Sequence, residues 1–351
     1  MNVNCPLPVN GVPGIITLGH GSGGLMTHQL LQTEVFDLFH NDWLDQQHDG
    51  ATFSLNGKVA FSTDSYVVSP LFFPGGNIGD LAINGTVNDL AMCGAMARYL
   101  SLSFIIEEGL ELSLFREVLQ HIKAAAQAAG VAIVTGDTKV VERGKGDQLF
   151  INTSGIGHIH PRAAIHHNRI LPGDVVIVSG EIAAHGMAIM SVRKGLEFET
   201  EVCSDTRPLH EMVGKLLDCF GEQVKFLRDP TRGGLASVLN EMTEATKLGV
   251  MMDEVSLPLN EQVAAACEML GLDPLYVANE GMMVAIVSAD VAPSVLSALR
   301  GMKGGEQAAI IGTVTKEHAG KVGLEGIELS ISCLVSSCRE FVKIVDAIVT
   351  K

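Results

Sequence analysis

The strongest constraint on the fold is an alternation of strand and helix patterns that stops at a polar segment and then starts again. That segment, residues 161–173, is rich in histidine and has a proline near each end. Before it, the apolar periodicity predicts helices at 26–40, 79–97 and 112–129 and strands at 99–106, 131–134 and 149–159. After it, the periodicity predicts strands at 174–179, 250–253, 283–287 and 308–314 and helices at 209–220, 235–248, 260–271 and 292–302. We therefore expect two α+β units joined near residue 167.

Glycine-containing turns shape the expected N-terminal part. A short strand at 15–18 should precede the string Gly19-His20-Gly21-Ser22-Gly23-Gly24. Asn56-Gly57 separates two apolar runs, 52–55 and 58–61. This dipeptide favours the two-residue type I′ turn, because both central residues of that turn need a positive φ. We expect a β-hairpin there, with Asp64 just past its second strand.

Composition limits the class of protein. Hydrophobic residues make up 47% and charged residues 18% of the 351 residues, which is typical of a globular chain with a large core. The apolar runs are too short to span a bilayer, and residues 1–14 lack the Lys, Arg and apolar stretch of a signal peptide. A formal net charge of −16 disfavours nucleic acid and anionic lipid as partners. The seven cysteines include no Cys-x-x-Cys, so we expect a reducing cytoplasm rather than a disulfide framework.

Four short strings place an aspartate beside glycine or another residue that favours a change of chain direction. They are Ser62-Thr63-Asp64-Ser65, Val87-Asn88-Asp89-Leu90, Thr135-Gly136-Asp137-Thr138-Lys139 and Arg228-Asp229-Pro230-Thr231-Arg232-Gly233-Gly234. Asp49, just before Gly50, is a weaker fifth member. A carboxylate at a strand end is a hard oxygen ligand, and several that converge form a magnesium site, which usually comes with a polyphosphate. Each aspartate taken alone also fits a helix cap or a turn. Together they predict an enzyme that uses ATP.

Other charged side chains near these strings suit phosphate and proton chemistry. Lys139 follows Asp137 by two residues, so on an extended segment the two side chains share a face. Lys139 there binds phosphate, transfers a proton or pairs with the acids. Arg228 and Arg232 are expected to donate to phosphate. Glu280, in the Asn279-Glu280-Gly281 turn, suits a general base.

The remaining motifs leave alternatives open. Gly19-x-Gly21-x-x-Gly24 has the form of the dinucleotide fingerprint, but no second strand ending in an acid follows its helix. It also fits a mobile loop that covers phosphates, or a plain flexible segment. No Gly-x4-Gly-Lys-Ser/Thr occurs, which excludes P-loop ATPases. The histidines at 158, 160, 166 and 167 suit weak metal binding more than a functional site. Cys93 is expected to be a packed thiol.

Taken together, the motifs resemble the HypE family of hydrogenase maturation proteins, from about residue 18 to about residue 324. The matching strings are Gly19-His20-Gly21-Ser22-Gly23-Gly24, Phe61-Ser62-Thr63-Asp64-Ser65-Tyr66-Val67, Phe72-Phe73-Pro74-Gly75-Gly76-Asn77-Ile78-Gly79, Asn88-Asp89, Thr135-Gly136-Asp137-Thr138-Lys139-Val140-Val141, Arg228-Asp229-Pro230-Thr231-Arg232-Gly233-Gly234 and Asn279-Glu280-Gly281. The family is similar to aminoimidazole ribonucleotide synthetase and selenophosphate synthetase. The resemblance implies an α/β (α+β) fold with two domains. The N-terminal α/β domain would form a dimeric β-barrel, and ATP and Mg²⁺ would bind between it and a C-terminal α+β domain.

This resemblance also implies domain bounds and site residues. The bounds are 1–47 for a glycine-rich segment and helix, 48–160 for the ATP-binding and dimerisation domain, 161–173 for a linker, 174–324 for the C-terminal domain and 325–351 for an atypical tail. The implied catalytic residues are Lys139, Glu280 and His20. The implied metal ligands are Asp49, Asp64, Asp89, Asp137 and Asp229. The implied ATP contacts are Gly21, Gly23, Gly24, Asn88, Gly136, Thr138, Arg228, Thr231 and Arg232.

The reaction implied by the resemblance is an ATP-dependent dehydration. In the family, the carbamoyltransferase HypF places a carbamoyl group on a C-terminal cysteine. ATP then converts this thiocarboxamide to a thiocyanate, and the cyano group passes to the HypC–HypD complex for a nickel–iron hydrogenase. The family ends in Pro-Arg-Ile-Cys, whereas residues from about 326 onward lack the family pattern. We expect Cys333 and Cys338 to be poor substitutes as carbamoyl acceptors.

Two rival functions remain at this point. The first is a selenophosphate synthetase type of enzyme. Such enzymes carry a reactive Cys-Lys pair in the N-terminal glycine loop, where this chain has His20-Gly21-Ser22. The second is a non-catalytic scaffold that binds HypF or HypC–HypD. We also expect a homodimer, because the predicted strand at 99–106 is apolar on both faces and needs cover on each side.

Overall fold

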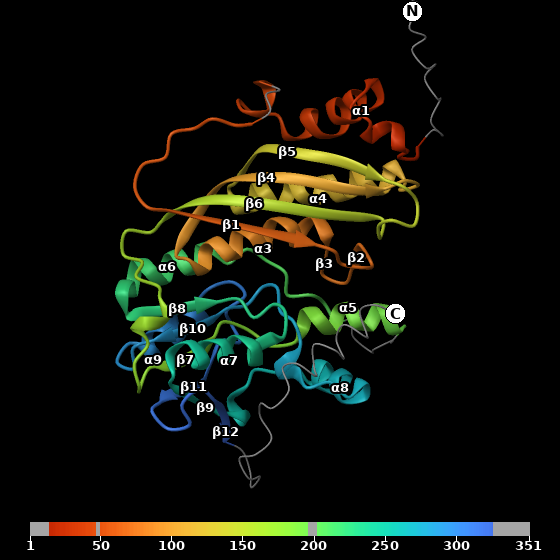
Figure 1. Cartoon of the computed structure of the whole chain (residues 1–351). Coiled ribbons are helices and arrows are strands. Elements are labelled where there is room, and N and C mark those ends of the chain that lie inside the picture. Colours follow the sequence, from red (N-terminus) through yellow and green to blue (C-terminus); the bar gives the residue numbers. More distant parts are fainter. Residues whose placement is uncertain (1–13, 47–49, 196–201, 326–351) are drawn as a thin grey trace, which may run out of the picture. The chain divides into compact units, whose positions relative to one another are not determined.

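The computed structural model describes residues 14–46, 50–195 and 202–325, which fall into two units (Figure 1). The first unit contains residues up to Ala163 together with Ala184–Lys215 and Asn279–Gly281. The second contains Ala164–Ala183, Leu216–Ala278 and the residues from Met282 on. The expected mixed α/β fold with two domains is confirmed. The single expected division after residues 161–173 differs from the observed units, because the chain returns twice to the first unit.

The first unit is built on a four-stranded sheet with helices on one face. The strand order is β1-β6-β4-β5, antiparallel except for the parallel pair β4–β5. The bounds are β1 Val59–Tyr66, β4 Ala95–Glu107, β5 Ala132–Val141 and β6 Leu149–Ile159. Helices α3 (Ile78–Met92) and α4 (Leu112–Ala129) lie against the sheet, as Figure 1 shows. The unit also holds α1 Leu25–Leu30, a π-helix η2 Leu31–Phe36, α2 Asp37–Phe39, β2 Phe72–Phe73, β3 Gly76–Asn77 and α5 Ala184–Lys194.

The sequence explains where the two covering helices begin and end. Asn77 caps α3, because its side-chain oxygen accepts the backbone N–H groups of Gly79 and Asp80. Asp80 closes the capping box by accepting the N–H of Asn77. Helix α4 ends at Gly130, whose φ of 65° is the left-handed conformation that glycine adopts easily. These caps fix the helices whose apolar faces form the core of this unit.

The other face of the sheet is open along much of its length. It carries Val59, Phe61, Met96 and Ile105, whose side chains are between 41% and 67% exposed. Their cross-strand partners on this face include Ile156 and Phe150. At one end Trp43 and Phe53 pack on the ring of Tyr99. The described residues of one copy therefore leave an apolar sheet face largely uncovered.

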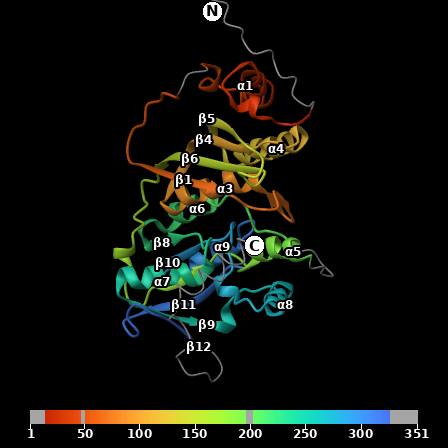
Figure 2. The ribbon, with the colours of Figure 1, turned by 45° about the vertical axis from the view of Figure 1, so that its right-hand side comes forward.

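The second unit is built on a six-stranded sheet, of order β12-β9-β11-β7-β10-β8. Its strands are β7 Val175–Val178, β8 Val224–Arg228, β9 Gly249–Asp253, β10 Val284–Val287, β11 Ala309–Thr315 and β12 Val322–Glu325. Its helices are α7 Gly234–Thr246, α8 Glu261–Leu270 and α9 Ala292–Arg300, while α6 His210–Phe220 begins in the first unit (Figure 2). Strand β10 is buried at every position, which its unbroken apolar sequence predicts.

Several predicted elements need correction. The hairpin at 52–61 is wrong, because residues 51–58 form no strand. There, the indole N–H of Trp43 donates to the carbonyl of Thr52. The strand at 15–18 reduces to one bridge at Ile15, followed by a 3-10 helix, η1 Leu18–Gly21. The helix at 79–97 ends at Met92, because Gly94 turns the chain with a φ of 74°.

Strands β2, β3, β8 and β12 and helix α5 were not predicted, and for β8 and α5 the reason can be identified. Strand β8 contains Lys225, which breaks the apolar pattern; this lysine is nevertheless buried, 2.7 Å from a carboxylate oxygen of Asp174. Helix α5 has a small, weakly patterned apolar face, and only its contacts with the first unit bury Ile189. Tertiary contacts therefore decide both elements.

Candidate active site

Two of the predicted acids, Asp64 and Asp89, lie on the side of β1 that faces α3. Asp64 pairs with Thr153 across the sheet, and the buried Thr153 donates to the carbonyl of Ala82 in α3, so this side of β1 faces the helix. The Ser62 hydroxyl, two residues away on the same side, donates to Asp89 Oδ2 at 2.7 Å. Both aspartates lie inside regular elements rather than at turns, which corrects the expected position of each string.

Several negatively charged side chains on this side of the sheet lie near the buried phenol of Tyr66. Burial raises the pKa of the phenol well above its usual value, and the negative charges of Asp64, Glu280 and Asp89 raise this pKa further. Its hydroxyl lies 3.3 Å from Thr86 Oγ1. Three of the predicted site residues, drawn from three separate parts of the chain, therefore lie within electrostatic reach of one buried ring.

Glu280 is held on this side by polar contacts to its backbone. Asp205 accepts the N–H of Glu280 at 3.0 Å and the N–H of Gly281 at 2.9 Å. The Asn88 amide donates to the carbonyls of Glu280 and Arg207, and its oxygen accepts the N–H of Leu209. Asn88 is only 1% exposed, and these protein groups occupy its amide, so its predicted role as an ATP contact has no support in this geometry.

Asp137 and Lys139 lie on the opposite face of the same sheet. The register aligns Asp137 with Ser103, Asn152 and Ser65, one residue out of phase with Asp64. The Lys139 ammonium lies 2.8 Å from Asp137 Oδ1, as the shared face predicted. This hydrogen bond is the main reason why the pKa of Asp137 is lowered. Since β1 and β5 are the two edges of the sheet, their backbones are about 14 Å apart.

The glycine string packs beside β5. Gly21 lies so close to Val140 that a Cβ atom on it would come 2.6 Å from the Val140 backbone nitrogen. Gly21, Gly23 and the stretch from Thr135 to Lys139, which includes Gly136 and Thr138, line one pocket of about 240 Å³. His20 Nδ1 accepts the N–H of Thr17 at 3.0 Å, which leaves the proton of a neutral ring on Nε2. The predicted glycine loop therefore lies beside the predicted lysine.

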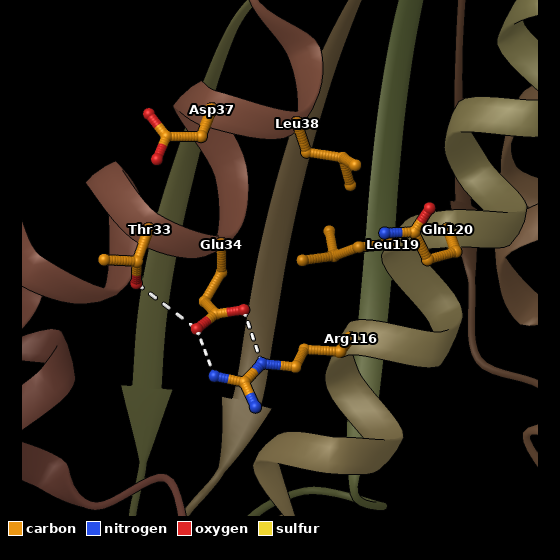
Figure 3. A pocket seen from close by; sticks show the side chains of 7 residues that line it. All are labelled: Thr33, Glu34, Asp37, Leu38, Arg116, Leu119 and Gln120. Atoms are coloured by element: carbon orange, nitrogen blue, oxygen red, sulfur yellow. Dashed lines mark hydrogen bonds and ion pairs between the residues drawn. The ribbon is translucent and has the colours of Figure 1, made fainter.

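A second pocket lies where η2 and α2 pack on α4. Two nitrogens of Arg116 in α4 donate hydrogen bonds to the Glu34 carboxylate, at 2.7 and 2.8 Å (Figure 3). This contact is the main reason why the pKa of Glu34 is lowered. The pocket has a volume of about 430 Å³ and is also lined by Asp37 and Gln120. Glu34 and Arg116 pair with each other across the two helices, and Asp37 Oδ1 accepts a hydrogen bond from the Gln32 amide.

The expected gathering of all the acids around one ion is absent from the part of the chain that the structure describes. No group of three His, Cys, Asp or Glu residues there is close enough to hold a metal. This finding also applies to His158, His160, His166 and His167. Mg²⁺ is usually held by one or two carboxylates plus substrate phosphates, so the pair Asp64 and Asp89 fits Mg²⁺ that arrives with ATP. Asp49, Cys333 and Cys338 lie outside the described residues.

The fourth string lies in the second unit, between β8 and α7. Arg228 ends β8, and its guanidinium lies 3.4 Å from Glu241 Oε2. Asp229 is 9% exposed and its carbonyl accepts the N–H of Thr231. Gly233 and Gly234 both have positive φ and form the turn, close to Arg232, that starts α7.

Sequence reasoning missed Asp205 and misplaced Cys93. Asp205 precedes α6 in the string Asp205-Thr206-Arg207-Pro208, which looks like an ordinary turn before a helix. Only its contacts with Glu280 and Gly281 reveal another role. Cys93, expected to be packed, is exposed.

Comparisons with known proteins connect this geometry to a family. Residues 47–159 match the model for the N-terminal domain of AIR synthase related proteins, and residues 172–325 match the model for the C-terminal domain. The chain is 48% identical over 305 residues to the carbamoyl dehydratase HypE of Rhizobium leguminosarum bv. viciae, covering 87% of each chain. It is 44% identical over 323 residues to that of Escherichia coli K12, covering 90% of this chain and 96% of the relative. The chain belongs to the HypE family.

Solved structures agree with membership of the HypE family. A crystal structure of the hydrogenase maturation protein HypE in complex with ATP is 43% identical, with a TM-score of 0.85, covering 91% of this chain and 99% of that chain. A HypE–HypF complex gives 43% identity and a TM-score of 0.76, covering 88% and 99%. No helix in the described ranges is long and apolar enough to cross a membrane.

Proposed function

We propose that this chain catalyses the ATP-dependent dehydration of a carbamoylated cysteine to a thiocyanate, in the maturation of nickel–iron hydrogenase. The observation that carries the proposal is the meeting of Asp64, Asp89 and Glu280 around Tyr66, in a member of the HypE family. A HypE relative binds ATP. Two carboxylates suit magnesium, and the third, from another segment, remains for proton chemistry.

The chemistry needs an activated oxygen and two proton transfers. The carbamoyl oxygen attacks the γ-phosphorus of ATP, ADP leaves, and the nitrogen loses one proton. Loss of phosphate from the carbon, with loss of the second proton from nitrogen, then forms the C≡N bond. We assign these protons to Glu280, with Lys139 as the alternative acceptor. Lys139 with its neutralising partner Asp137 also suits contact with phosphate.

Asp64 and Asp89 would hold Mg²⁺. The ion would neutralise the charge that develops on the transferred phosphoryl group. Its presence matters because the chain carries a net charge of −16, which repels bare polyphosphate. Arg228, Thr231 and Arg232, with Asp229, remain proposed contributors from the second unit. The glycine loop, including His20, Gly23 and Gly24, remains a proposed cover for phosphates.

The working form that we propose is a homodimer through the open face of the four-stranded sheet. The exposed Phe61 and Ile105 on this face give it an apolar surface that needs a partner. Asp137 and Lys139 lie on the same face, so such a dimer brings them next to the second copy. The candidate residues divide between β1 and β5, and a site shared between two copies would accommodate this division.

The proposed partners follow from family membership. HypF would supply the carbamoyl group, since a HypE–HypF complex is known. HypC–HypD would receive the cyano group. We also propose a cytoplasmic location for these maturation steps.

A direct assay tests the function. The full chain is incubated with Mg²⁺, ATP and a short peptide ending in S-carbamoylcysteine. We expect ADP formation and loss of one water from the peptide by mass spectrometry. An unmodified peptide, with ATP binding intact, would contradict the dehydratase function and favour a scaffold. In parallel, HypF with carbamoyl phosphate and ATP tests whether the chain itself accepts carbamoyl, with Cys333 and Cys338 examined by peptide mapping.

A further inference from the structure

The backbone of Glu280 and Gly281 is fixed on all sides by side chains from distant parts of the chain. Asp205 accepts both N–H groups, one on each carboxylate oxygen. Asn88 donates to the carbonyl of Glu280 at 3.2 Å, and the Arg207 guanidinium donates to the carbonyl of Gly281 at 2.6 Å. All four backbone polar groups of these two residues are therefore bonded. The two residues lie in neither helix nor strand, so side chains supply what secondary structure would supply elsewhere.

The fit at Gly281 leaves no room for adjustment. A Cβ atom on Gly281 would lie 1.6 Å from the carbonyl oxygen of Asp205, so glycine is the residue that permits this approach. Asp205 is deeply buried, and burial raises the pKa of its carboxyl, while the two N–H donors and the Arg207 charge oppose this rise. A buried carboxylate with this many donors is costly to leave unpaired. The contact therefore holds its two sides together firmly.

We propose that Asp205 is a positioning residue for Glu280: its carboxylate clamps the backbone on which the base is carried, and so sets where the Glu280 carboxylate stands. This inference rests on the proposed function, in which Glu280 takes protons from the substrate nitrogen. Both carboxylate oxygens of Asp205 accept these backbone N–H groups, so Asp205 would act through Glu280. Proton transfer is sensitive to such placement, because a misplacement of about 1 Å can cost about 10²-fold in rate.

If Asp205 positions Glu280, loss of its carboxylate should lower kcat but leave the affinity for ATP nearly unchanged. Asp205→Ala should lower kcat for the S-carbamoylcysteine peptide by about 10²-fold. The affinity for ATP with Mg²⁺, measured by calorimetry, should change by less than about twofold, since Asp64 and Asp89 lie on other elements. Asp205→Asn keeps one acceptor oxygen, so it should fall between the wild type and Asp205→Ala.

A double-variant cycle separates positioning from general damage. If Asp205 acts through Glu280, then Asp205→Ala combined with Glu280→Gln should be no slower than Glu280→Gln alone. Effects that multiply, or ATP affinity that falls in parallel with kcat, would overturn the proposal. Asp80→Ala is the matched control. Asp80, a half-buried carboxylate of the first unit, also accepts a backbone N–H, but it caps α3 and should leave kcat unchanged.

A second measurement tests the contact between Asp205 and the backbone of Glu280 and Gly281 independently of the proposed function. Amide hydrogen exchange in a fragment covering residues 279–281 should speed up in Asp205→Ala and remain unchanged in Asp80→Ala. If the wild-type chain binds ATP but turns over no peptide, the proposed function fails. Hydrogen exchange then remains the test of whether Asp205 fixes the backbone of Glu280 and Gly281. Unchanged exchange at Glu280 and Gly281 in Asp205→Ala would overturn it.

Discussion

At the scale of single residues, the direction of a side chain matters more than its place in a motif. Asp64 and Asp137 occur in similar strings, yet the sheet register places them on opposite faces. Asp89, from a third string, joins Asp64 because α3 packs on the same side. Within one copy, Asp64 and Asp89 therefore lie on one side of the sheet and Asp137 lies on the other.

The magnesium pair leads to the first prediction. Asp64→Asn and Asp89→Asn should each weaken binding of ATP with Mg²⁺ by about 1–3 kcal/mol, the scale of a lost charged contact. Calorimetry with and without Mg²⁺ measures this, and excess chelator should abolish binding in the wild type. Asp253→Asn, which alters a cap in the second unit, serves as the control. Equal ATP affinity in chelator would count against the metal pair.

His185 gives a prediction about pH. Burial lowers its pKa to about 4, and its Nδ1 lies 2.8 Å from the Ser204 hydroxyl. In the unfolded chain the imidazole takes up a proton near pH 6.5, whereas in the folded chain it stays neutral down to about pH 4. The stability that the neutral, buried His185 contributes is therefore complete above pH 6.5 and is lost as the pH falls towards 4. We expect this one group to lower the free energy of unfolding by about 3 kcal/mol over that range. In His185→Gln, the urea midpoint should depend less on pH between 4.5 and 7; an unchanged slope would refute the assignment.

At the scale of elements, the N-terminal helices owe their place to a few polar contacts. The Glu34–Arg116 pair ties η2 to α4 (Figure 3). The same segment leads back to the glycine loop beside β5. The π-helical geometry of η2 departs from the regular helix that periodicity predicts there. The segment that follows the glycine loop is therefore joined to α4 by an ion pair between residues 82 positions apart.

That ion pair gives the third prediction. Because the pKa of Glu34 is lowered in the folded chain, the ionised carboxylate contributes to the free energy of unfolding above about pH 4.5. This contribution is lost as the pH falls through the folded-state pKa. Because Arg116 is more than half exposed, we expect Glu34→Gln to reduce the free energy of unfolding by at most about 1 kcal/mol at pH 7. Below pH 4 the difference between wild type and variant should shrink. A difference that grew in acid would contradict the pairing.

The elements also show how far the sequence predicts the structure. The predicted bounds of α4 and β6, residues 112–129 and 149–159, match the structure. Both have a strong period and clear ends. Strand β8 was not predicted, because the charged Lys225, which pairs with Asp174, interrupts its apolar pattern. Asp64, Asp89 and Glu280 were candidates from the sequence, but their approach to Tyr66 was not predicted. Asp205 was missed, because Asp205 and Glu280 meet across 75 positions and no local pattern encodes such a contact.

At the scale of the whole molecule, the open sheet face gives the fourth prediction. Phe61→Glu should convert a dimer into a monomer, because it places a charge in the centre of the proposed apolar interface. Light scattering at micromolar concentration measures the mass. Met269→Glu is the control, since Met269 of α8 is 68% exposed, close to the 67% of Phe61, but lies in the second unit. A wild-type chain that is monomeric would overturn the proposed dimer.

The two returns of the chain to the first unit bear on whether the protein can be divided. Residues 184–215 bring Asp205, and residues 279–281 bring Glu280, into a unit that otherwise ends at Ala163. A polypeptide that stops in the apparent linker would carry the proposed magnesium ligands, Asp64 and Asp89, but would lack the proposed base and its support. Expressing the two family-model regions, 47–159 and 172–325, as separate polypeptides would divide one unit between them. Recombination between relatives at the linker would likewise exchange part of an active site, so the whole span from Asp64 to Gly281 is expected to be inherited together.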